Sequence, residues 1–398
     1  MEHFDFILAG GGAAGLSLAY HMVQGGLGDR RMLIIDLDTK TRNDRTWCFW
    51  IDRPMLFDPI VARRWDHIWF HGPDRSHRFA MAPFEYRMIR GIDFYEYTRN
   101  ALVRLENVTF LQARVSAVED GSADGVEKAR VRTEDGQEFS ADWVFNSLFV
   151  PRDFTVDQSR YYFLKQHFAG WVIKTKTPVF DPDAATLFDL RIPQDGAFRF
   201  MYLLPISETE SLVEYTLFSE RLLPQEEYQQ GIRDYLEGEL GISEYEILEE
   251  ESGIIPMTDQ PFPVREGHRI MNIGTRGGRV KASTGFAFFR TNRDSERIVA
   301  SLLQKGTPFH DQRPPRRYRT FDSMLLSVLH HHPDQGRDIF VKLFERNPLM
   351  RLFRFLDEEG SLAENVKLMS TVPWAPFISA WFRVKWRQRF GGAGVSGN

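Results

Sequence analysis

The amino-acid sequence predicts an α/β protein with three parts: a Rossmann-like dinucleotide-binding domain, an inserted substrate domain with a mixed or antiparallel sheet, and a helical C-terminal region. Three observations predict this fold. A glycine-rich turn joins an apolar strand to a helix near the N-terminus, apolar and polar residues alternate between about 160 and 260, and helical periodicity dominates beyond 310. We expect these parts to comprise 1–150 with 265–310, 151–264, and 311–398.

The composition is that of an ordinary globular protein, with 398 residues, a formal net charge of −5 and a single cysteine, Cys48. The net charge gives no electrostatic reason to expect a nucleic-acid partner. One cysteine excludes an intrachain disulfide and agrees with a reducing, cytoplasmic compartment. We expect Cys48 to be a small core or loop residue. The sequence contains no run of about 18 apolar residues, so we expect no membrane-spanning helix.

The first predicted elements form a β-α-β unit: a buried strand over 5–9, a helix from about 13 to 24, and a strand over 31–36. The first glycine of the G-x-G-x-x-G motif allows a tight turn. The second lets backbone approach a pyrophosphate, and the third lets the helix pack on the strand. The helix N-terminus would stabilise phosphates, and the carboxylate ending the second strand would bind a ribose hydroxyl. The predicted cofactor-binding residues are Gly10, Gly12, Ala13, Ala14, Gly15 and Asp36.

A second glycine cluster lies far along the chain. A predicted strand over 268–273 leads into the cluster at 274–278, and a helix resumes near Ser283. A single N-terminal β-α-β unit combined with such a late strand-turn-helix favours FAD over NAD, because in many flavoproteins the late element closes the far end of the cofactor site. A simple loop is the alternative for this segment. The cofactor-binding residues predicted here are Gly274, Gly277 and Gly278.

The remaining elements follow from periodicity and turn residues. In the first domain we expect an extended connection over 39–53 and a helix over 91–106. Strands should follow over 108–118 and 129–134, separated by a polar loop at 119–125. A strand at 143–147 should return to the first sheet. The inserted domain should hold a hairpin of strands 198–204 and 210–218 around the turn 205–208, and a helix within 222–240. The C-terminal helices are predicted at 321–332, 335–346, 348–357 and 361–370.

Glu214 is the candidate acid of the inserted domain. On a strand, Leu212, Glu214, Thr216 and Phe218 share one face. A carboxyl group on this largely apolar face would be desolvated, which raises its pKa and favours the protonated acid. The alternative is a glutamate at a sheet surface that is paired with an arginine or solvated.

Three consecutive histidines at 330–332 suggest a metal site at first sight. Consecutive residues on a helix point in different directions, and no cluster of further ligands accompanies them. We therefore interpret them as surface residues and expect no bound metal.

Four motifs of this sequence resemble those of the lycopene cyclase family. They are Asn43-Asp44-Arg45-Thr46-Trp47-Cys48-Phe49-Trp50, the segment 89–95, the segment 273–286, and the pair 352–358 with 369–373. The resemblance extends from about residue 3 to residue 380. The family usually has a small residue at the position of Arg276 and proline at that of Ala282, so these departures concern the geometry near the expected flavin.

The resemblance implies a function. Leu212-Val213-Glu214-Tyr215-Thr216 resembles the family motif whose first glutamate protonates the terminal double bond of lycopene or a related linear carotenoid. Ring closure and loss of a proton then give a cyclic isomer, with β-rings as the expected product. The family needs reduced FAD, and NAD(P)H is the expected reductant. Arg45, with Asp44, either positions flavin or substrate or forms a structural ion pair.

Two other functions remain open. A redox flavoenzyme of the same broad fold, such as an FAD-dependent hydroxylase or an isoprenoid reductase, would change the mass of its substrate, whereas cyclisation would not. A carotenoid- or lipid-binding flavoprotein without catalysis would leave the substrate unchanged.

The segment 373–390 is aromatic and basic. Tryptophan and phenylalanine interleaved with arginine and lysine suit the headgroup boundary of a membrane, and the cations would favour anionic lipid. The segment is too short and too charged to span a bilayer. We expect a protein peripheral to the membrane. The alternative is a helix that packs on the body of the protein with its basic face in solvent.

Overall fold

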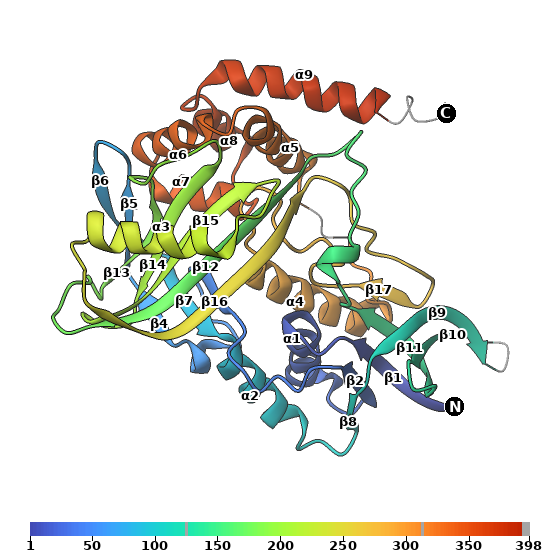
Figure 1. Ribbon diagram of the computed structural model, residues 1–398. Helices are drawn as coiled ribbons and strands as arrows, with labels where there is room; N and C mark the ends of the chain where they lie inside the picture. Colours follow the sequence, from blue (N-terminus) through green and yellow to red (C-terminus); the bar gives the residue numbers. More distant parts are fainter. Residues whose placement is uncertain (124–125, 312–313, 392–398) are drawn as a thin grey trace.

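A computed structural model describes residues 1–123, 126–311 and 314–391 (Figure 1). Its first sheet has the strand order β8-β2-β1-β11-β10-β9, and β17 pairs with the C-terminal half of β11. Strands β8, β2, β1, β11 and β17 are parallel, whereas β10 and β9 form an antiparallel extension. The bounds are β1 Glu2–Ala9, β2 Met32–Asp36, β8 Val108–Gln112, β9 Val115–Ala123, β10 Val126–Thr133, β11 Glu138–Asn146 and β17 Ile270–Asn272.

The predicted β-α-β unit and the late strand are confirmed. Helix α1 (Ala13–Met22) continues into a π-helical turn, Val23–Leu27, where Gly26 has φ 98° and ends the helix. Helix α4 (Phe288–Lys305) packs against α1 through a buried hydrogen bond in which Ser17 Oγ donates to Asn292 Oδ1 at 3.0 Å. The N-terminal motif and the late segment, far apart in sequence, are therefore joined in one core.

Three predictions for this part are wrong in detail. The segment 39–53 contains a strand, β3 (Thr46–Ile51), which pairs with β7 (Glu85–Arg90) in a three-stranded sheet completed by β4 (Arg63–Trp65). Trp47 and Phe49 pack into the dinucleotide-domain core, whereas Trp50 packs into the other core. Because both faces of β3 are apolar, the strand shows no alternation of apolar and polar residues.

The polar loop predicted at 119–125 instead belongs to the β9–β10 hairpin, apart from residues 124–125, which lie outside the described residues. The hairpin is polar because it forms the edge of the sheet. Helix α4 begins at Phe288 rather than near Ser283, because Gly285 has φ 73° and the chain turns there before the helix starts.

The second sheet has the order β16-β12-β15-β14-β13-β5-β6 and is antiparallel except between β13 and β5. Strands β5 and β6 come from the segment that we expected to lie in the dinucleotide domain. The bounds are β5 His67–His71, β6 Ser76–Ala80, β12 Phe163–Thr175, β13 Ala184–Asp189, β14 Phe198–Pro205, β15 Glu210–Ser219 and β16 Tyr245–Thr258. Two short 3-10 turns, Asp58–Ile60 and Pro151–Asp153, lie in the connections.

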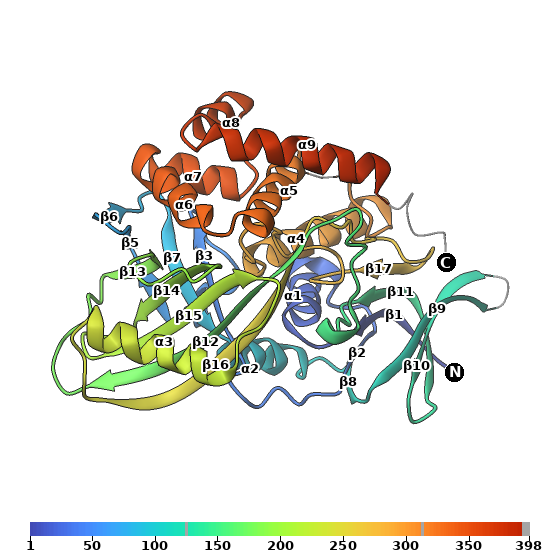
Figure 2. The same ribbon diagram turned by 45° about the horizontal axis from the view of Figure 1, so that its top comes forward.

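Helices cover both faces of the second sheet (Figure 2). Helix α3 (Gln225–Gly238) packs on one face against Val213, Tyr215 and Leu217. The C-terminal helices lie on the other, where Leu212 and Phe218 share a core with Phe340 and Phe344. The predicted alternation along β15 is thus confirmed. The remaining helices are α2 Gly91–Leu102, α5 Arg316–His331, α6 Gln335–Arg346, α7 Leu349–Leu356, α8 Leu362–Met369 and α9 Trp374–Phe390. Helix α5 begins earlier than predicted, directly after Pro315.

A buried group of charges attaches the C-terminal helices to the dinucleotide domain. Lys281 Nζ donates to both carboxylate oxygens of Asp322 at 2.9 and 3.0 Å and to Glu358 Oε1 at 3.1 Å. Arg290 NH1 contacts the other oxygen of Glu358 at 2.9 Å. Lys281 is only 2% exposed, so its charge must be neutralised inside the protein.

We expect Lys281→Met to lower the free energy of unfolding by about 3 kcal/mol, because it leaves two carboxylates in a site without their shared cation. Urea denaturation followed by circular dichroism measures this loss. Lys176→Met is the matched control, since Lys176 pairs with Glu244 while 82% exposed and should cost less than about 1 kcal/mol. Equal losses for the two variants would contradict the prediction.

Candidate active site

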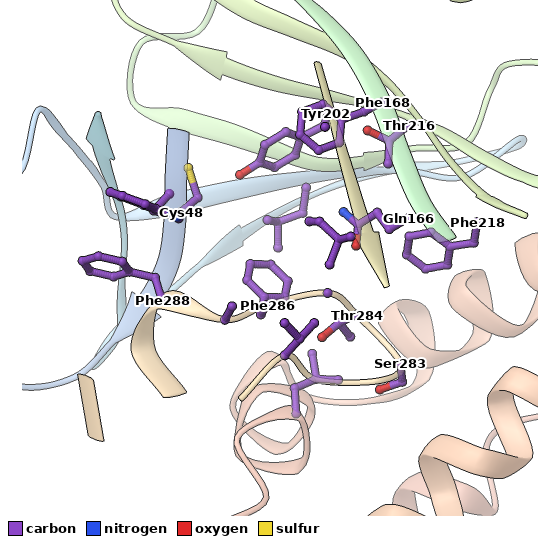
Figure 3. Close-up of a pocket in the computed structure, with 18 of the residues that line it drawn as sticks. Cys48, Gln166, Phe168, Tyr202, Thr216, Phe218, Ser283, Thr284, Phe286 and Phe288 are labelled. Atoms are coloured by element: carbon purple, nitrogen blue, oxygen red, sulfur yellow. The ribbon is translucent and has the colours of Figure 1, made fainter. Parts of the chain in front are cut away.

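One cavity of about 590 Å³ extends from the N-terminus of α1, along the inner face of the second sheet, to the C-terminal helices. Figure 3 shows Phe168, Tyr202 and Thr216 from the sheet on one side and the turn of Ser283, Thr284 and Phe286 on the other. The glycine motif and the strand that carries Glu214 therefore line the same cavity.

The glycine motif has the geometry of a phosphate-binding turn. Gly10 has φ 107°, and a Cβ at Gly15 would lie 2.0 Å from the Gly10 carbonyl oxygen, so both positions require glycine. A Cβ at Gly12, by contrast, would meet no atom within 4 Å. The Gly11 backbone N–H donates to Asp36 Oδ2 at 2.6 Å, which places this carboxylate beside the turn. The open space beside Gly12, at the N-terminus of α1, fits a dinucleotide pyrophosphate.

The second glycine cluster packs against the N-terminus of α1. A Cβ at Gly274, whose φ is 58°, would lie 2.6 Å from the Ala14 Cβ, and one at Gly277 would lie 2.4 Å from the Asn272 carbonyl oxygen. Gly278 has φ 73°. Of the predicted cofactor residues, the cavity is lined by Gly12, Ala13, Ala14, Arg45 and Gly274. The others shape the turns outside its wall: Gly10, Gly15, Asp36, Gly277 and Gly278.

Arg45 and Asp44 both line the cavity and also form an ion pair, with Arg45 NH2 2.8 Å from Asp44 Oδ2. The two departures from the family pattern lie outside the cavity wall. Arg276 donates to Asn272 Oδ1 at 2.9 Å and contacts Glu266 at 2.7 Å, and Ala282 packs against the core of the second sheet.

Glu214 lies on β15 with its carboxyl group on the cavity side and is 8% exposed. Burial raises the pKa of this carboxyl well above its usual range, and a hydrogen bond and charge repulsion from Glu251 raise the pKa further. Both effects favour the protonated form of the Glu214 carboxyl. This environment agrees with the desolvated face that the strand pattern predicts.

Glu251 is a site residue that our sequence reasoning missed. It lies on β16 and lines the cavity, and its Oε2 accepts a hydrogen bond from Thr46 Oγ1 at 2.9 Å. Glu214 and Glu251 are both in register with Gly170 of the strand between them. Only strand register brings them together, so no spacing in the sequence could reveal the pair.

A second polar group lies next to Glu214. Tyr202 is opposite Glu214 in the β14–β15 register, and its hydroxyl lies 2.6 Å from that of Tyr86. Cys48, from β3, lies near both tyrosines, and burial raises the pKa of its thiol. The predicted small core or loop cysteine is thus a cavity-lining residue in its neutral form.

The wall also carries buried oxygen atoms that lack a hydrogen-bond partner among the described residues: Gln166 Oε1, Thr216 Oγ1 and Thr284 Oγ1. Their side chains lie around the centre of the cavity in Figure 3. Buried polar atoms are nearly always satisfied, so these three fit the polar edge of a bound cofactor or an ordered water. Otherwise the wall is rich in aromatic side chains, including Phe168, Phe188, Phe200, Phe218, Phe286, Phe340 and Phe344.

Within the described ranges, no group of three or more histidine, cysteine, aspartate or glutamate side chains is placed to hold a metal ion. Of the three histidines, His330 pairs with Glu220 and His331 Nδ1 contacts the Ser327 carbonyl oxygen at 2.9 Å. The same part of the chain contains no helix that combines the length and apolarity needed to cross a membrane.

Comparison with solved structures gives the class of the fold. A flavin-dependent brominase has a TM-score of 0.63 at 14% identity, over 96% of this chain and 99% of its own. The HpxO protein of Klebsiella pneumoniae, in a complex with FAD, has a TM-score of 0.55 at 13% identity, over 94% of this chain and 100% of its own. The chain has the fold of FAD-binding monooxygenases and reductases.

The family follows from the sequence comparison. A family model described as lycopene cyclase protein matches residues 5–381, so the chain belongs to the lycopene cyclase family. A lycopene beta-cyclase from Pseudescherichia vulneris is 25% identical over 95% of this chain and 96% of its own. One from Pantoea ananas is 24% identical over 95% and 97%.

Proposed function

We propose that this protein binds FAD and, with the flavin reduced, cyclises the linear ends of lycopene to β-rings without net redox change. The observation that carries the proposal is the buried carboxyl group of Glu214 on the wall of a largely apolar cavity that also reaches the glycine motif. Membership of the lycopene cyclase family supports the carotenoid substrate.

Glu214 is the proposed proton donor. Its O–H bond would break as a C–H bond forms at the terminal double bond, which leaves a tertiary cation that an internal double bond attacks. Loss of a proton from the ring then restores neutrality. The surrounding phenylalanines would stabilise the cation through their ring faces and exclude the water that would otherwise capture it. Which carbon loses the proton decides the ring type.

FAD would lie with its pyrophosphate at Gly12, Ala13 and Ala14 and its ribose near Asp36. The unpartnered oxygens of Gln166, Thr216 and Thr284 are available to its polar atoms. Reduced flavin would supply electron density that favours cationic states of the substrate. We propose NAD(P)H as the reductant.

The competing function is redox catalysis, which the fold class favours because it includes monooxygenases and reductases. Product mass separates the two functions. Cyclisation leaves the mass unchanged, hydroxylation adds an oxygen atom and reduction adds hydrogen atoms.

We expect purified protein with reduced FAD to convert lycopene in liposomes, under anaerobic conditions, to an isomer of unchanged mass. Glu214→Gln keeps the shape of the side chain but removes the transferable proton, so the rate should fall by about 100-fold or more. Chromatography, absorption spectra and mass spectrometry identify the product. Glu210→Gln, on the same strand but away from the cavity, is the control and should keep the activity. A product of altered mass would instead support redox catalysis.

The glycine geometry predicts a difference between two substitutions. Gly12→Ala places a methyl group where the pyrophosphate should lie but meets no protein atom, so FAD affinity should fall by about tenfold or more with little change in stability. Gly15→Ala would collide with the Gly10 carbonyl and should cost about 2 kcal/mol or more. Flavin fluorescence and urea denaturation measure the two effects. Unchanged FAD binding by Gly12→Ala would rule out this placement.

We also propose that α9 contacts a membrane surface. Its buried side, including Phe377 and Val384, faces the protein, whereas Trp374, Phe382 and Trp386 are 62–72% exposed. Two of its arginines point inward, since Arg383 donates to Ser327 Oγ at 3.3 Å and Arg387 to the Ser159 carbonyl at 3.4 Å. The face in solvent is thus strongly aromatic, which suits the headgroup boundary.

We expect the triple substitution Trp374→Ser, Phe382→Ser and Trp386→Ser to weaken binding to anionic liposomes by about tenfold or more, because the exposed aromatic surface is lost. Co-sedimentation measures the binding. Val103→Ser with Leu303→Ser removes exposed apolar side chains elsewhere on the protein and should leave the binding unchanged. Equal binding by all three proteins would exclude α9 as the contact.

A further inference from the structure

We propose that Glu251 is a positioning residue for Glu214: it shares the proton of the pair and keeps that proton on Glu214 until it is transferred. The inference rests on the proposed function, because it assigns Glu214 as the acid. It concerns a carboxyl group on a different strand, far from the motif that contains Glu214.

The pair forms because the strand between the two glutamates, β12, has a glycine at their register. Glu214 on β15 and Glu251 on β16 flank Gly170 of β12 in register. A Cβ at Gly170 would lie 2.7 Å from Glu214 Cγ and 3.3 Å from the Val213 carbonyl oxygen. Residues in register on strands two apart are normally separated by the side chain between them. Because glycine has none, no side chain of β12 separates Glu214 from Glu251, and the two carboxyl groups approach each other across Gly170.

The hydrogen bond from Thr46 distinguishes Glu251 from Glu214 and bears on which of the two carboxyl groups carries the proton. The Thr46 hydroxyl donates to Glu251 Oε2 at 2.9 Å, so Glu251 is the member of the pair that already accepts a hydrogen bond from another side chain. Glu214 receives no such donor in the described part of the chain, and it is the more buried of the two. Two adjacent carboxyl groups in a low dielectric share one proton, and here this asymmetry assigns it to Glu214.

The other titratable groups facing the pair do not neutralise it. Tyr202 lies opposite Glu214 on β14, and Cys48 and Tyr86 come from β3 and β7. Burial raises the pKa of all three, so they are neutral. Arg45 lies on the wall of the same cavity, and it pairs with Asp44. Among the described residues, neither Glu214 nor Glu251 forms an ion pair.

The pair can also both supply and recover the proton that the proposed reaction needs. When the Glu214 O–H bond breaks and the C–H bond of the substrate forms, both carboxyl groups are left without a proton, and their negative charge faces the new cation. After ring closure a ring C–H bond breaks and its proton returns to the pair. No net proton is consumed, in agreement with an isomerisation.

The test is the pH profile of cyclisation under reduced FAD, measured for the wild type, Glu251→Gln and Glu251→Asp. Activity should fall as pH rises and Glu214 loses its proton. Glu251→Gln removes the neighbouring negative charge, so the midpoint of this fall should move to lower pH by about one unit or more. Glu251→Asp keeps a carboxylate at a greater distance and should give an intermediate midpoint. Glu250→Gln, one residue away on the opposite face of β16, should match the wild type.

Infrared spectroscopy of the protonated carboxyl C=O band tests the same point without turnover. The band that Glu214→Gln removes belongs to Glu214, and it should disappear at lower pH in Glu251→Gln than in the wild type. An unmoved band and an unmoved activity midpoint in folded Glu251→Gln would overturn the role of Glu251. A wild type that yields no cyclic isomer, yet shows the shifted band in Glu251→Gln, would overturn the proposed function and leave the pairing intact.

Discussion

Desolvation of the Glu214 carboxyl is the physical constraint on which the site depends. A carboxylic acid can protonate an alkene only if it is still protonated near neutral pH and if little water is present to capture the cation. In the proposed reaction both needs would be served by the position of Glu214, which lies on the inner face of a sheet that α3 covers on one side and the C-terminal helices cover on the other. Glu251 adds a like charge, which the apolar surroundings make effective.

The same constraint explains why the C-terminal helices must be held in place. They supply much of the apolar wall, so any loosening would admit water to the acid. Lys281 joins the turn before α4 to Asp322 on α5 and to Glu358 after α7. Trp50 adds a second link from β3, because its Nε1 donates to Asp357 at 2.7 Å and its ring stacks on Phe353. Residues from three of the four family motifs thus form one polar attachment between domains.

Features that depend on residues close together in the chain could be predicted from local patterns in the sequence. The glycine motif, the strand faces around Glu214 and most helix positions follow from spacing alone, and the structure confirms these elements. Non-local pairing was not accessible in the same way. Strand β3 was missed because both of its faces are buried, and β5 joins β13 from a distant segment. The contact of Glu251 with Glu214 depends on the register of three strands and on the missing side chain of Gly170.

The cavity extends to the start of α9, the helix that we propose contacts a membrane surface. One end of the cavity is lined by Gly12 and Ala14 and the other by Val372 and Phe377, which flank the start of α9. Phe377 lies on the buried side of that helix, and Trp374, one turn earlier, is exposed. The proposed membrane contact of α9 would thus place the lipid surface near the apolar end of the cavity. The glycine motif, where the cofactor is proposed to bind, lines the same cavity at a distance in the fold from α9, so the two proposals concern different ends of one site.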